Sequence, residues 1–242
     1  MAKINGISEM FTVCMYQLRS NMTKKKVTTV VILFIALLFV INGAGFLQFL
    51  AFIFWAFRPS IPITLLIPYY AMVALMPVIA IVVTHNLFAG EIEQKTVRFV
   101  ITKIRRSSYL AGKLLATVIV HVVIIFLIVL ISFLYTYYQI RQYFVAESFL
   151  IFFALVAYSI SLISLYSFIS VFSGKSEKSL QLSIVATIIL AIFIMISSLQ
   201  KFSPMWYAKQ VFVAPHIAFF FWIAVAMTML SGSVVLLERK QL

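Results

Sequence analysis

The densest group of ionisable side chains lies between Gly90 and Lys113. This 24-residue stretch carries eight of the 25 charged residues, after 32 residues without a charge and before another 27. Its two carboxylates, Glu91 and Glu93, come first and its bases follow. Acids near the amino end of a helix and bases toward its carboxyl end complement the helix dipole, and Glu91 is spaced to pair with Lys95 across one turn. The order of charges therefore predicts a short charged helix.

Residue patterns that support hydrolysis or nucleotide binding are absent from the sequence. It contains no His-Glu-x-x-His, paired-Glu or Gly-x-Ser-x-Gly arrangement, which argues against an intramembrane hydrolase. Gly174-Lys175-Ser176 copies the end of a phosphate-binding loop, but the leading glycine would fall at position 169, which is Ile inside an apolar run. If the protein uses ATP, we expect another polypeptide to bind it.

Three histidines remain as candidates for metal or proton chemistry. His85 and His216 are expected near opposite ends of the membrane, so they cannot join His121 in one metal site. His121 is the only titratable candidate inside a predicted span, about 12 Å beyond Lys113 at 1.5 Å per residue. It is either a neutral hydrogen-bonding residue facing a neighbouring helix or part of a transport pathway. The spans lack Asp and Glu, which argues against transport coupled to ions through a buried carboxylate.

The composition is that of a membrane protein. The chain is 64% hydrophobic and only 10% charged, whereas soluble domains are roughly 25% charged. Six charge-free runs are each long enough for the roughly 20 residues that a helix needs to cross a bilayer, and they do not alternate in polarity. We therefore expect an all-α, polytopic membrane protein with six transmembrane helices, within the runs 27–57, 59–90, 114–140, 148–174, 179–200 and 210–237.

The distribution of basic residues predicts the orientation. With the amino terminus inside, 15 of the 19 Lys and Arg fall on the cytoplasmic side, and only four fall outside: Arg58, Arg141, Lys201 and Lys209. This asymmetry favours a multi-pass protein of the cell membrane with both termini in the cytoplasm. The net charge of +13 then reflects topology and attraction to anionic lipid headgroups, and no nucleic-acid partner is expected.

Segments at the start of the chain and within two spans have alternative interpretations. In residues 1–26, Ile4, Ile7, Phe11 and Leu18 recur at helical spacing, which predicts an amphipathic helix in the inner headgroup layer; a merely solvated helix is the alternative.

Pro68 and Pro77 would kink the second span, either to shape a pathway or because packing tolerates them. The fourth span carries serines that would let helices approach closely or line a channel: Ser159, Ser161, Ser164, Ser167, Ser170 and Ser173.

The charged stretch must leave the membrane. Burying its eight charges would cost on the order of 20 kcal/mol at roughly 2.5–3.5 kcal/mol each, and the topology places it in the cytoplasm. The predicted helix over 91–101 is also more apolar than a solvated loop requires, because it includes Ile92, Val97, Phe99, Val100 and Ile101. This apolar content indicates a surface that another protein covers.

The stretch also resembles a loop of the type 2 permeases of ATP-binding-cassette (ABC) transporters. That loop, between spans two and three, typically reads Glu-x-x-x-Gly-Thr-Leu-x-x-Leu-Leu, then a Pro-containing turn, Arg and Gly-Lys. The matching residues here are Glu91, Thr96-Val97, Phe99-Val100, Arg106 and Gly112-Lys113. Lys95 stands in place of the family's Gly, and Lys103 in place of its Pro. With six spans and an amphipathic entry helix, the resemblance covers nearly the whole chain.

The resemblance implies a single transmembrane permease domain over 1–242, with a cytoplasmic coupling loop at 90–108. In the family this loop forms a coupling helix that docks on a cytosolic ATPase. The docking residues implied here are Glu91, Glu93, Thr96, Val97, Phe99, Val100 and Arg106.

The assembly implied is two permease subunits, identical or homologous, with two ABC ATPase subunits that hold ATP and Mg²⁺. This chain would carry no catalytic residue, metal or cofactor. The expected function is ATP-driven export of an amphiphilic substrate, such as a peptide, a lipid or a hydrophobic drug, with Pro68, Pro77 and His121 as candidate pathway residues. The alternatives are a non-transporting membrane scaffold or immunity protein, and an ion-coupled secondary transporter.

Overall fold

The fold is a bundle of long helices. A computed structural model describes residues 6–21, 61–95, 104–196 and 199–239, and all structural statements here concern those residues. They form helices and no strands, so the all-α prediction is confirmed for this part of the chain. Five helices are long and apolar enough to cross a membrane: α4 (Ile63–Thr84), α7 (Arg106–Ile140), α8 (Val145–Ser173), α9 (Ser176–Met195) and α11 (Pro215–Arg239). They match five of the six predicted spans, and the first predicted span, within 27–57, lies outside the described residues.

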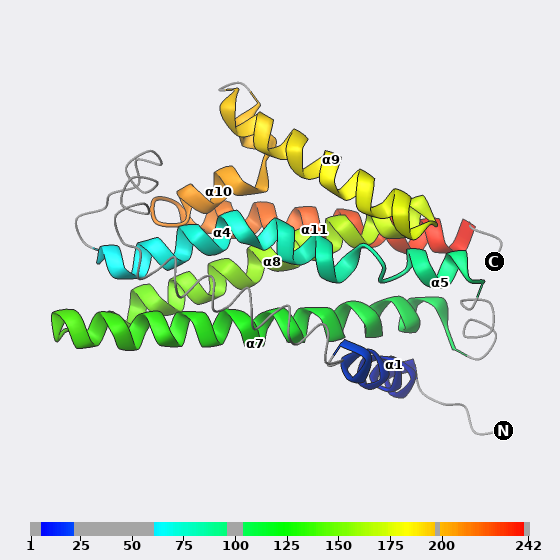
Figure 1. Ribbon diagram of the computed structural model, residues 1–242, viewed down its shortest axis with the longest axis horizontal. Coiled ribbons are helices and arrows are strands. Elements are labelled where there is room, and N and C mark those ends of the chain that lie inside the picture. Colours follow the sequence, from blue (N-terminus) through cyan, green and yellow to red (C-terminus); the bar gives the residue numbers. More distant parts are fainter. Residues whose placement is uncertain (1–5, 22–60, 96–103, 197–198, 240–242) are drawn as a thin grey trace.

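Helix α8 is the centre of the bundle, because α4, α7, α9 and α11 all pack against it. Figure 1 shows α4, α7, α8 and α11 running along the long axis, while α9 leans away from the others at one end. Two shorter helices, α1 (Gly6–Asn21) and α5 (Ala89–Glu93), lie at the same end of the bundle as the end of α11. The opposite end carries the turn between α7 and α8 and the short helix α10 (Pro204–Gln210).

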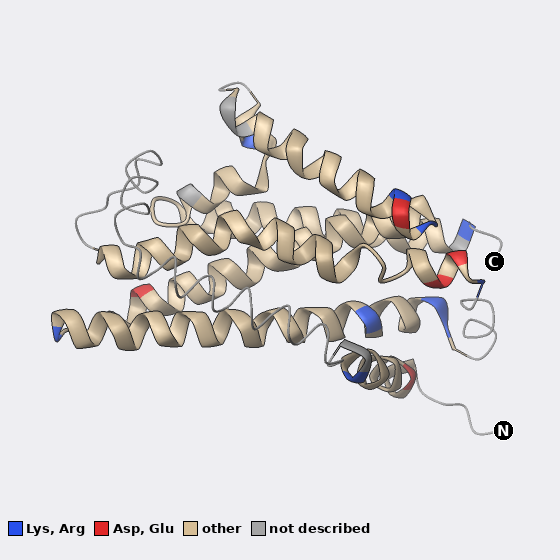
Figure 2. Cartoon of the chain, viewed as in Figure 1, with Lys and Arg blue, Asp and Glu red and all other residues tan. Residues whose placement is uncertain are grey.

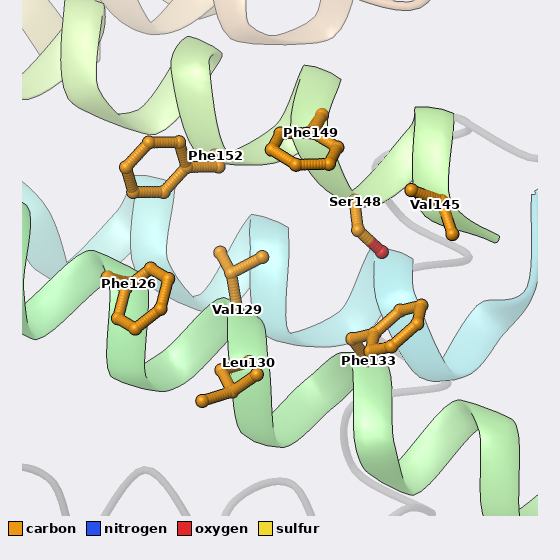
Figure 3. A pocket seen from close by; sticks show the side chains of 8 residues that line it. All are labelled: Phe126, Val129, Leu130, Phe133, Val145, Ser148, Phe149 and Phe152. Carbon is orange, nitrogen blue, oxygen red and sulfur yellow. The ribbon is translucent and has the colours of Figure 1, made fainter. Parts of the chain in front are cut away.

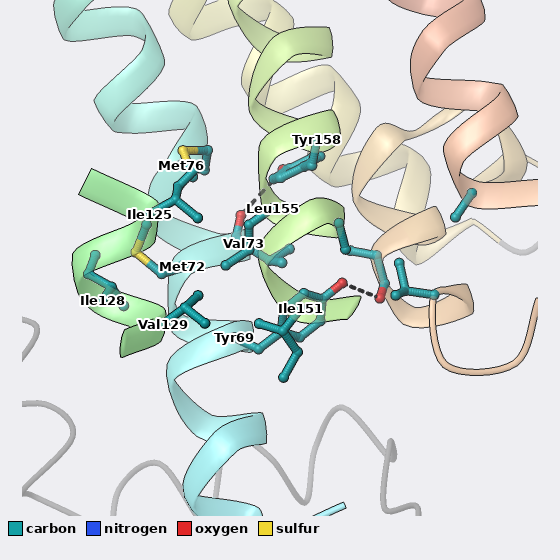
Figure 4. Packing of buried hydrophobic residues seen from close by; sticks show 14 of the residues in the cluster. Tyr69, Met72, Val73, Met76, Ile125, Ile128, Val129, Ile151, Leu155 and Tyr158 are labelled. Carbon is teal, nitrogen blue, oxygen red and sulfur yellow. Dashed lines mark hydrogen bonds between the residues drawn. The ribbon is translucent and has the colours of Figure 1, made fainter. Parts of the chain in front are cut away.

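The main core lies where α4, α7 and α8 meet. In Figure 4, Met72 and Met76 of α4 point toward Ile125 of α7. Two buried tyrosines bring polar tips into this apolar cluster, and each finds a backbone acceptor: Tyr69 donates to the Ala208 carbonyl at 2.7 Å, and Tyr158 donates to the Val73 carbonyl at 3.3 Å. These hydrogen bonds offset the cost of burying the two hydroxyl groups in an apolar core.

Helix α4 continues through both of its prolines. Pro68 and Pro77 are inside the helix and buried, as is common in membrane helices, where neighbouring helices compensate for the lost donor. Beside Pro68, the gap between α4, α7 and α8 is only about 10 Å³, which is about the space that one water molecule requires. The surroundings of Pro68 are therefore close-packed, and a pathway role for the two prolines stays a prediction.

Charge is segregated along the bundle. In Figure 2 the charged residues gather at the end that carries α1 and α5, and only a few lie at the opposite end. Large apolar side chains are exposed along the long helices between these ends. This pattern is typical of a bundle that spans a bilayer and exposes one strongly charged end.

Candidate functional site

The front of the charged stretch forms a very short helix. Helix α5 begins at Ala89, directly after the turn that follows α4, and ends at Glu93. The predicted helix over 91–101 is therefore seen only at its front: α5 ends at Glu93, and Lys95 has a φ of 58°, in the left-handed region. Residues 96–101 lie outside the described residues. Lys95 also lies beyond the helix end, so it cannot form the predicted one-turn pair with Glu91. Left-handed backbone favours glycine, and Lys95 stands where the resembling permeases have Gly.

Glu91 instead pairs with Lys113 of α7. The Lys113 ammonium lies 2.6 Å from Oε1 of Glu91, and the two side chains are 4% and 33% exposed. The ammonium also donates to the Leu87 carbonyl at 2.7 Å and lies 5.4 Å and 5.0 Å from the ring centroids of Phe88 and Tyr109. The Tyr109 hydroxyl donates to the other oxygen of Glu91. An almost fully buried charge thus has a counter-charge, a carbonyl and two aromatic faces, which together offset its desolvation.

Ser170 of α8 holds the junction between α4 and α5. Its hydroxyl accepts from the backbone N–H groups of Phe88 at 3.2 Å and Ala89 at 3.0 Å. It also donates to the His85 carbonyl at 3.0 Å. One buried hydroxyl thereby satisfies three backbone groups that the break between the two helices leaves without intrahelical partners. The sequence did not distinguish Ser170 from the other serines of this span, which were expected only to allow close packing or line a channel.

Glu93 links α5 to a third span. Its carboxylate accepts from the backbone N–H of Ser176, the first residue of α9, at 3.0 Å. A carboxylate at the amino end of a helix is stabilised by the free N–H groups and the helix dipole. Helix α5 is therefore bonded to α7 through Glu91, to α8 through Ser170, and to α9 through Glu93.

Helix α1 packs across α7 next to the buried lysine. The crossing point is Gly112, where an added Cβ would lie 2.5 Å from the Met10 carbonyl oxygen and 2.9 Å from Cβ of Val13. Cys14 is also buried in this contact, and burial raises the pKa of its thiol. A carboxylate oxygen of Glu9 accepts from the backbone N–H of Arg105 at 3.2 Å. The opposite side of α1 exposes Ile7, Phe11, Met15 and Tyr16.

The predicted docking residues fall in two groups. Glu91, Glu93 and Arg106 are described; Arg106 donates to the Leu237 carbonyl near the end of α11 at 3.3 Å. Thr96, Val97, Phe99 and Val100 lie outside the described residues. Sequence reasoning missed Ser170, Tyr109 and Leu87. Tyr109 had a usable signal, because it precedes Lys113 by four residues and so shares its helix face.

The candidate pathway residues are not part of this junction. Pro68 and Pro77 lie within α4, and His121 lies two turns beyond Lys113 in α7. The His121 ring is buried, and its Nδ1 lies 2.9 Å from the Thr117 carbonyl oxygen of the same helix. The hydrogen bond at Nδ1 is therefore within α7, whereas the sequence predicted a bond to a neighbouring helix.

The bonds described above join groups of this chain to one another. Across the described ranges, no cluster of three His, Cys, Asp or Glu side chains could hold a metal ion. The ion pair of Glu91 and Lys113 is engaged with groups of the chain itself. A displacement of α5 would have to move these bonded partners or break their contacts.

Comparison with known proteins identifies the family of this chain. A family model described as ABC-2 family transporter protein matches residues 7–233. No curated protein matches the chain. The match extends from α1 to α11 and includes the junction of α5 with its three neighbouring spans. The chain belongs to the ABC-2 family of transporter proteins and is a multi-pass membrane permease of that family.

Proposed function

We propose that this chain is the permease subunit of an ATP-driven exporter for an amphiphilic substrate and is coupled through residues 90–108 to a separate cytosolic ATPase. Family membership implies an ABC ATPase as a partner. The assembly proposed is two permease subunits and two ATPase subunits, with ATP and Mg²⁺ bound by the ATPases. The observation that carries the proposal is the bonding of α5 to three spans through Glu91, Ser170 and Glu93.

The coupling argument starts from the position of α5. The helix leads directly into the loop that is proposed to dock on the ATPase, and its own contacts lead into the bundle. A displacement of the loop would be transmitted to α7 through the buried ion pair and to α8 through Ser170. It would be transmitted to α9 through the bond between Glu93 and the first residue of that helix. Conformational switching in transporters needs such packed elements that move as units. Closure of the ATPases on ATP would therefore bias the bundle between two arrangements.

The orientation proposed has α1, α5 and the end of α11 on the cytoplasmic side. These three elements lie at the same end of the bundle, which is also the strongly charged end. Helix α1 packs one face on α7 and turns Ile7, Phe11 and Met15 outward. This exposed apolar face is suited to lie in the inner headgroup layer, as expected for an amphipathic helix at a membrane surface.

The test is recovery of the ATPase with the permease. Val97→Asp changes the apolar part of the docking loop, while Val213→Asp makes the same exchange at an exposed position in the turn between α10 and α11. Purification from detergent should recover the ATPase with the Val213→Asp protein and at least about tenfold less with Val97→Asp, a loss of about 1.4 kcal/mol or more. Equal recovery from both variants at equal expression would remove the coupling assignment.

Transport itself separates this function from its alternatives. In proteoliposomes that contain permease and ATPase, substrate movement should persist after proton and sodium gradients are collapsed and should require ATP hydrolysis. Gradient-driven uptake by the permease alone would support an ion-coupled transporter. Binding of the ATPase without movement of peptides, lipids or hydrophobic drugs would support a non-transporting scaffold or immunity protein.

A further inference from the structure

The contacts that α8 makes with α7 and with α9 differ in chemistry. Between α7 and α8 lies an apolar groove of about 240 Å³, and Figure 3 shows phenylalanine side chains of both helices around it. Helix α9 buries no such side chain. Among the described side chains of α9, only Ser179 and Ser183 are buried, each at 0% exposure. The buried part of α9 therefore consists of hydroxyl side chains.

These hydroxyls follow one face of α9. Ser179, Ser183 and Thr187 are spaced four residues apart, so they lie along one face over about 12 Å of the helix. Thr187 identifies the neighbour of this face, because its Oγ1 lies 2.6 Å from the hydroxyl of Tyr166 in α8. The Thr187 hydroxyl donates to the Ser183 carbonyl at 2.8 Å, so Tyr166 is the donor to Thr187. We call these four residues the α8–α9 seam.

Two hydroxyls of the seam have no hydrogen-bond partner within the described residues. They belong to Ser179 and Ser183, and both oxygen atoms are buried. A buried hydroxyl without a partner costs free energy. Alanine at both positions would allow equally close packing without this cost. Two unsatisfied hydroxyls on one buried face therefore indicate a partner that binds there when the seam is open.

Helix α9 can move away from α8 with little loss of packing. It is the least buried of the five spans. Its apolar side chains, such as Ile184, Val185 and Ile188, are already 45–53% exposed. The turn that joins it to α8 contains Gly174 in the left-handed region, with a φ of 64°. Figure 1 shows α9 leaning away from the other long helices at one end. Opening of the seam would expose mainly hydroxyl groups.

The chemistry around the seam selects a neutral polar group. Residues 148–174 and 179–200 include no Asp, Glu, Lys or Arg. A charged group of a ligand would find no counter-charge from these two segments, and an unpaired charge inside a membrane is costly. A serine hydroxyl can both donate and accept a hydrogen bond, which suits a hydroxyl or an amide. The exposed aliphatic side chains of α9 suit a hydrocarbon chain on the same molecule.

We propose that the α8–α9 seam opens during the transport cycle and binds the neutral hydroxyl or amide group of the amphiphilic substrate at Ser179 and Ser183. The hydrocarbon chain of the substrate stays among the lipids beside α9. This assignment rests on the proposed export function and specifies its substrate. The bond from Glu93 to the backbone N–H of Ser176, the first residue of α9, connects the seam to α5. The structure shows the closed seam, since Ser179 and Ser183 are fully buried.

Reaction with a charged thiol reagent tests the opening. Ser183→Cys and Ile184→Cys, each in a Cys14→Ser protein, place thiols at nearly the same depth on α9, but Ser183 is 0% exposed and Ile184 is 45% exposed. The permease and its ATPase are placed in phospholipid nanodiscs with ATP and treated with sulfonatoethyl methanethiosulfonate. Ser183→Cys should react at least about tenfold faster, because this anion enters an open, wet seam and is excluded from the hydrocarbon around position 184.

Protection of the same thiol identifies the class of ligand. Monododecanoylglycerol carries neutral hydroxyls, whereas dodecyltrimethylammonium and dodecyl phosphate carry a charge on a chain of the same length. The neutral probe should slow the reaction of Ser183→Cys at least about threefold, and the two charged probes should leave the rate unchanged. Reaction of Ile184→Cys under the same conditions shows whether a probe acts only by disturbing the bilayer.

The outcomes separate this site from the export function on which it rests. Reaction of Ser183→Cys no faster than that of Ile184→Cys would overturn the proposal. So would equal slowing by all three probes, slowing by the charged probes alone, or slowing by none. If the unmodified complex still shows ATP-driven transport in vesicles, any of these results removes the seam and leaves the export function standing. Fast reaction and selective protection without such transport would keep the site and contradict export.

Discussion

The Lys113 ammonium of α7 lies 2.6 Å from the Glu91 carboxylate of α5. This ion pair joins the longest span to the helix that leads into the proposed docking loop. Lys113 is almost completely buried, and its other neighbours are the Leu87 carbonyl and the rings of Phe88 and Tyr109. The junction therefore depends on a charge that has no access to bulk water, which makes its partner energetically important.

Glu91→Gln should destabilise the protein by about 3 kcal/mol, at the low end of the range for breaking a buried pair because Glu91 is partly exposed. The loss arises because the Lys113 charge stays buried without its counter-charge. Unfolding by denaturing detergent would measure it. Glu93→Gln is the control, because the Glu93 carboxylate accepts an exposed bond from Ser176, and it should change stability by less than about 0.5 kcal/mol. Adding Lys113→Gln to Glu91→Gln should restore part of the lost stability, because it removes the unpaired buried charge. Equal stabilities of the Glu91→Gln and Glu93→Gln proteins would contradict the assignment.

Ser170→Ala should cost about 1–3 kcal/mol, because buried N–H groups of Phe88 and Ala89 lose their acceptor. It should also weaken the dependence of ATP hydrolysis on substrate, since α5 would be released from α8. Ser164→Ala is a matched control: Ser164 is buried in the same helix, but its hydroxyl only donates to the Ile160 carbonyl of that helix. If both variants keep substrate-dependent ATP hydrolysis unchanged, Ser170 does not position α5.

Gly112→Ala should displace α1 from α7. The added methyl would lie 2.5 Å from the backbone oxygen of Met10, and a helix backbone cannot yield as a side chain can. The readout is alkylation of Cys14, the only cysteine in the sequence, which should become at least about tenfold faster, or roughly 1.4 kcal/mol in the opening equilibrium. Gly6→Ala is the control, because its added methyl would meet Ser108 at an ordinary 3.4 Å. Unchanged alkylation in Gly112→Ala would contradict the close crossing.

Cys14 in the unchanged protein should react slowly with maleimide at neutral pH and faster as the pH rises. The thiolate is the reactive species, and burial raises the pKa of this thiol above its ordinary value. At any given pH below that raised pKa, a smaller fraction is ionised than in an exposed cysteine. A cysteine placed at the exposed position Tyr16, in a Cys14→Ser protein, provides the comparison. A rate profile for Cys14 that levels off at the same pH as the Tyr16→Cys profile would contradict the shift.

Much of the helical architecture could be predicted from the sequence, because the physical signal is local. A run without charges that is long enough to cross a bilayer has few options other than a helix. The spans expected within 114–140 and 148–174 appear as α7 and α8, extended beyond the apolar runs at their ends. The prediction of a charged segment outside the membrane rested on the same local reasoning, and α5 lies at the charged end of the bundle.

The partners of the charged residues could not be predicted in this way. The spacing of charges along the sequence predicted an ion pair between Glu91 and Lys95. The helix ends before Lys95, whose backbone is left-handed, and the Glu91 carboxylate pairs with Lys113 on another helix. Nothing in the spacing of the serines set Ser170 apart from Ser164, because both are buried on one helix and only the fold brings the α4–α5 break to Ser170.

The sequence by itself determined that the chain crosses a membrane as helices, where most of these spans lie, and where charge must leave the bilayer. These outcomes follow from the transfer free energy of each segment, which depends on its own residues. Tertiary structure alone decided that α5 is bonded to three spans, that Gly112 is the crossing point of α1 and α7, and that α7 and α8 enclose a groove. Such features depend on which helix faces meet, and many rotations of a uniformly apolar helix have nearly the same transfer free energy. Close packing and a few buried polar bonds select among those rotations.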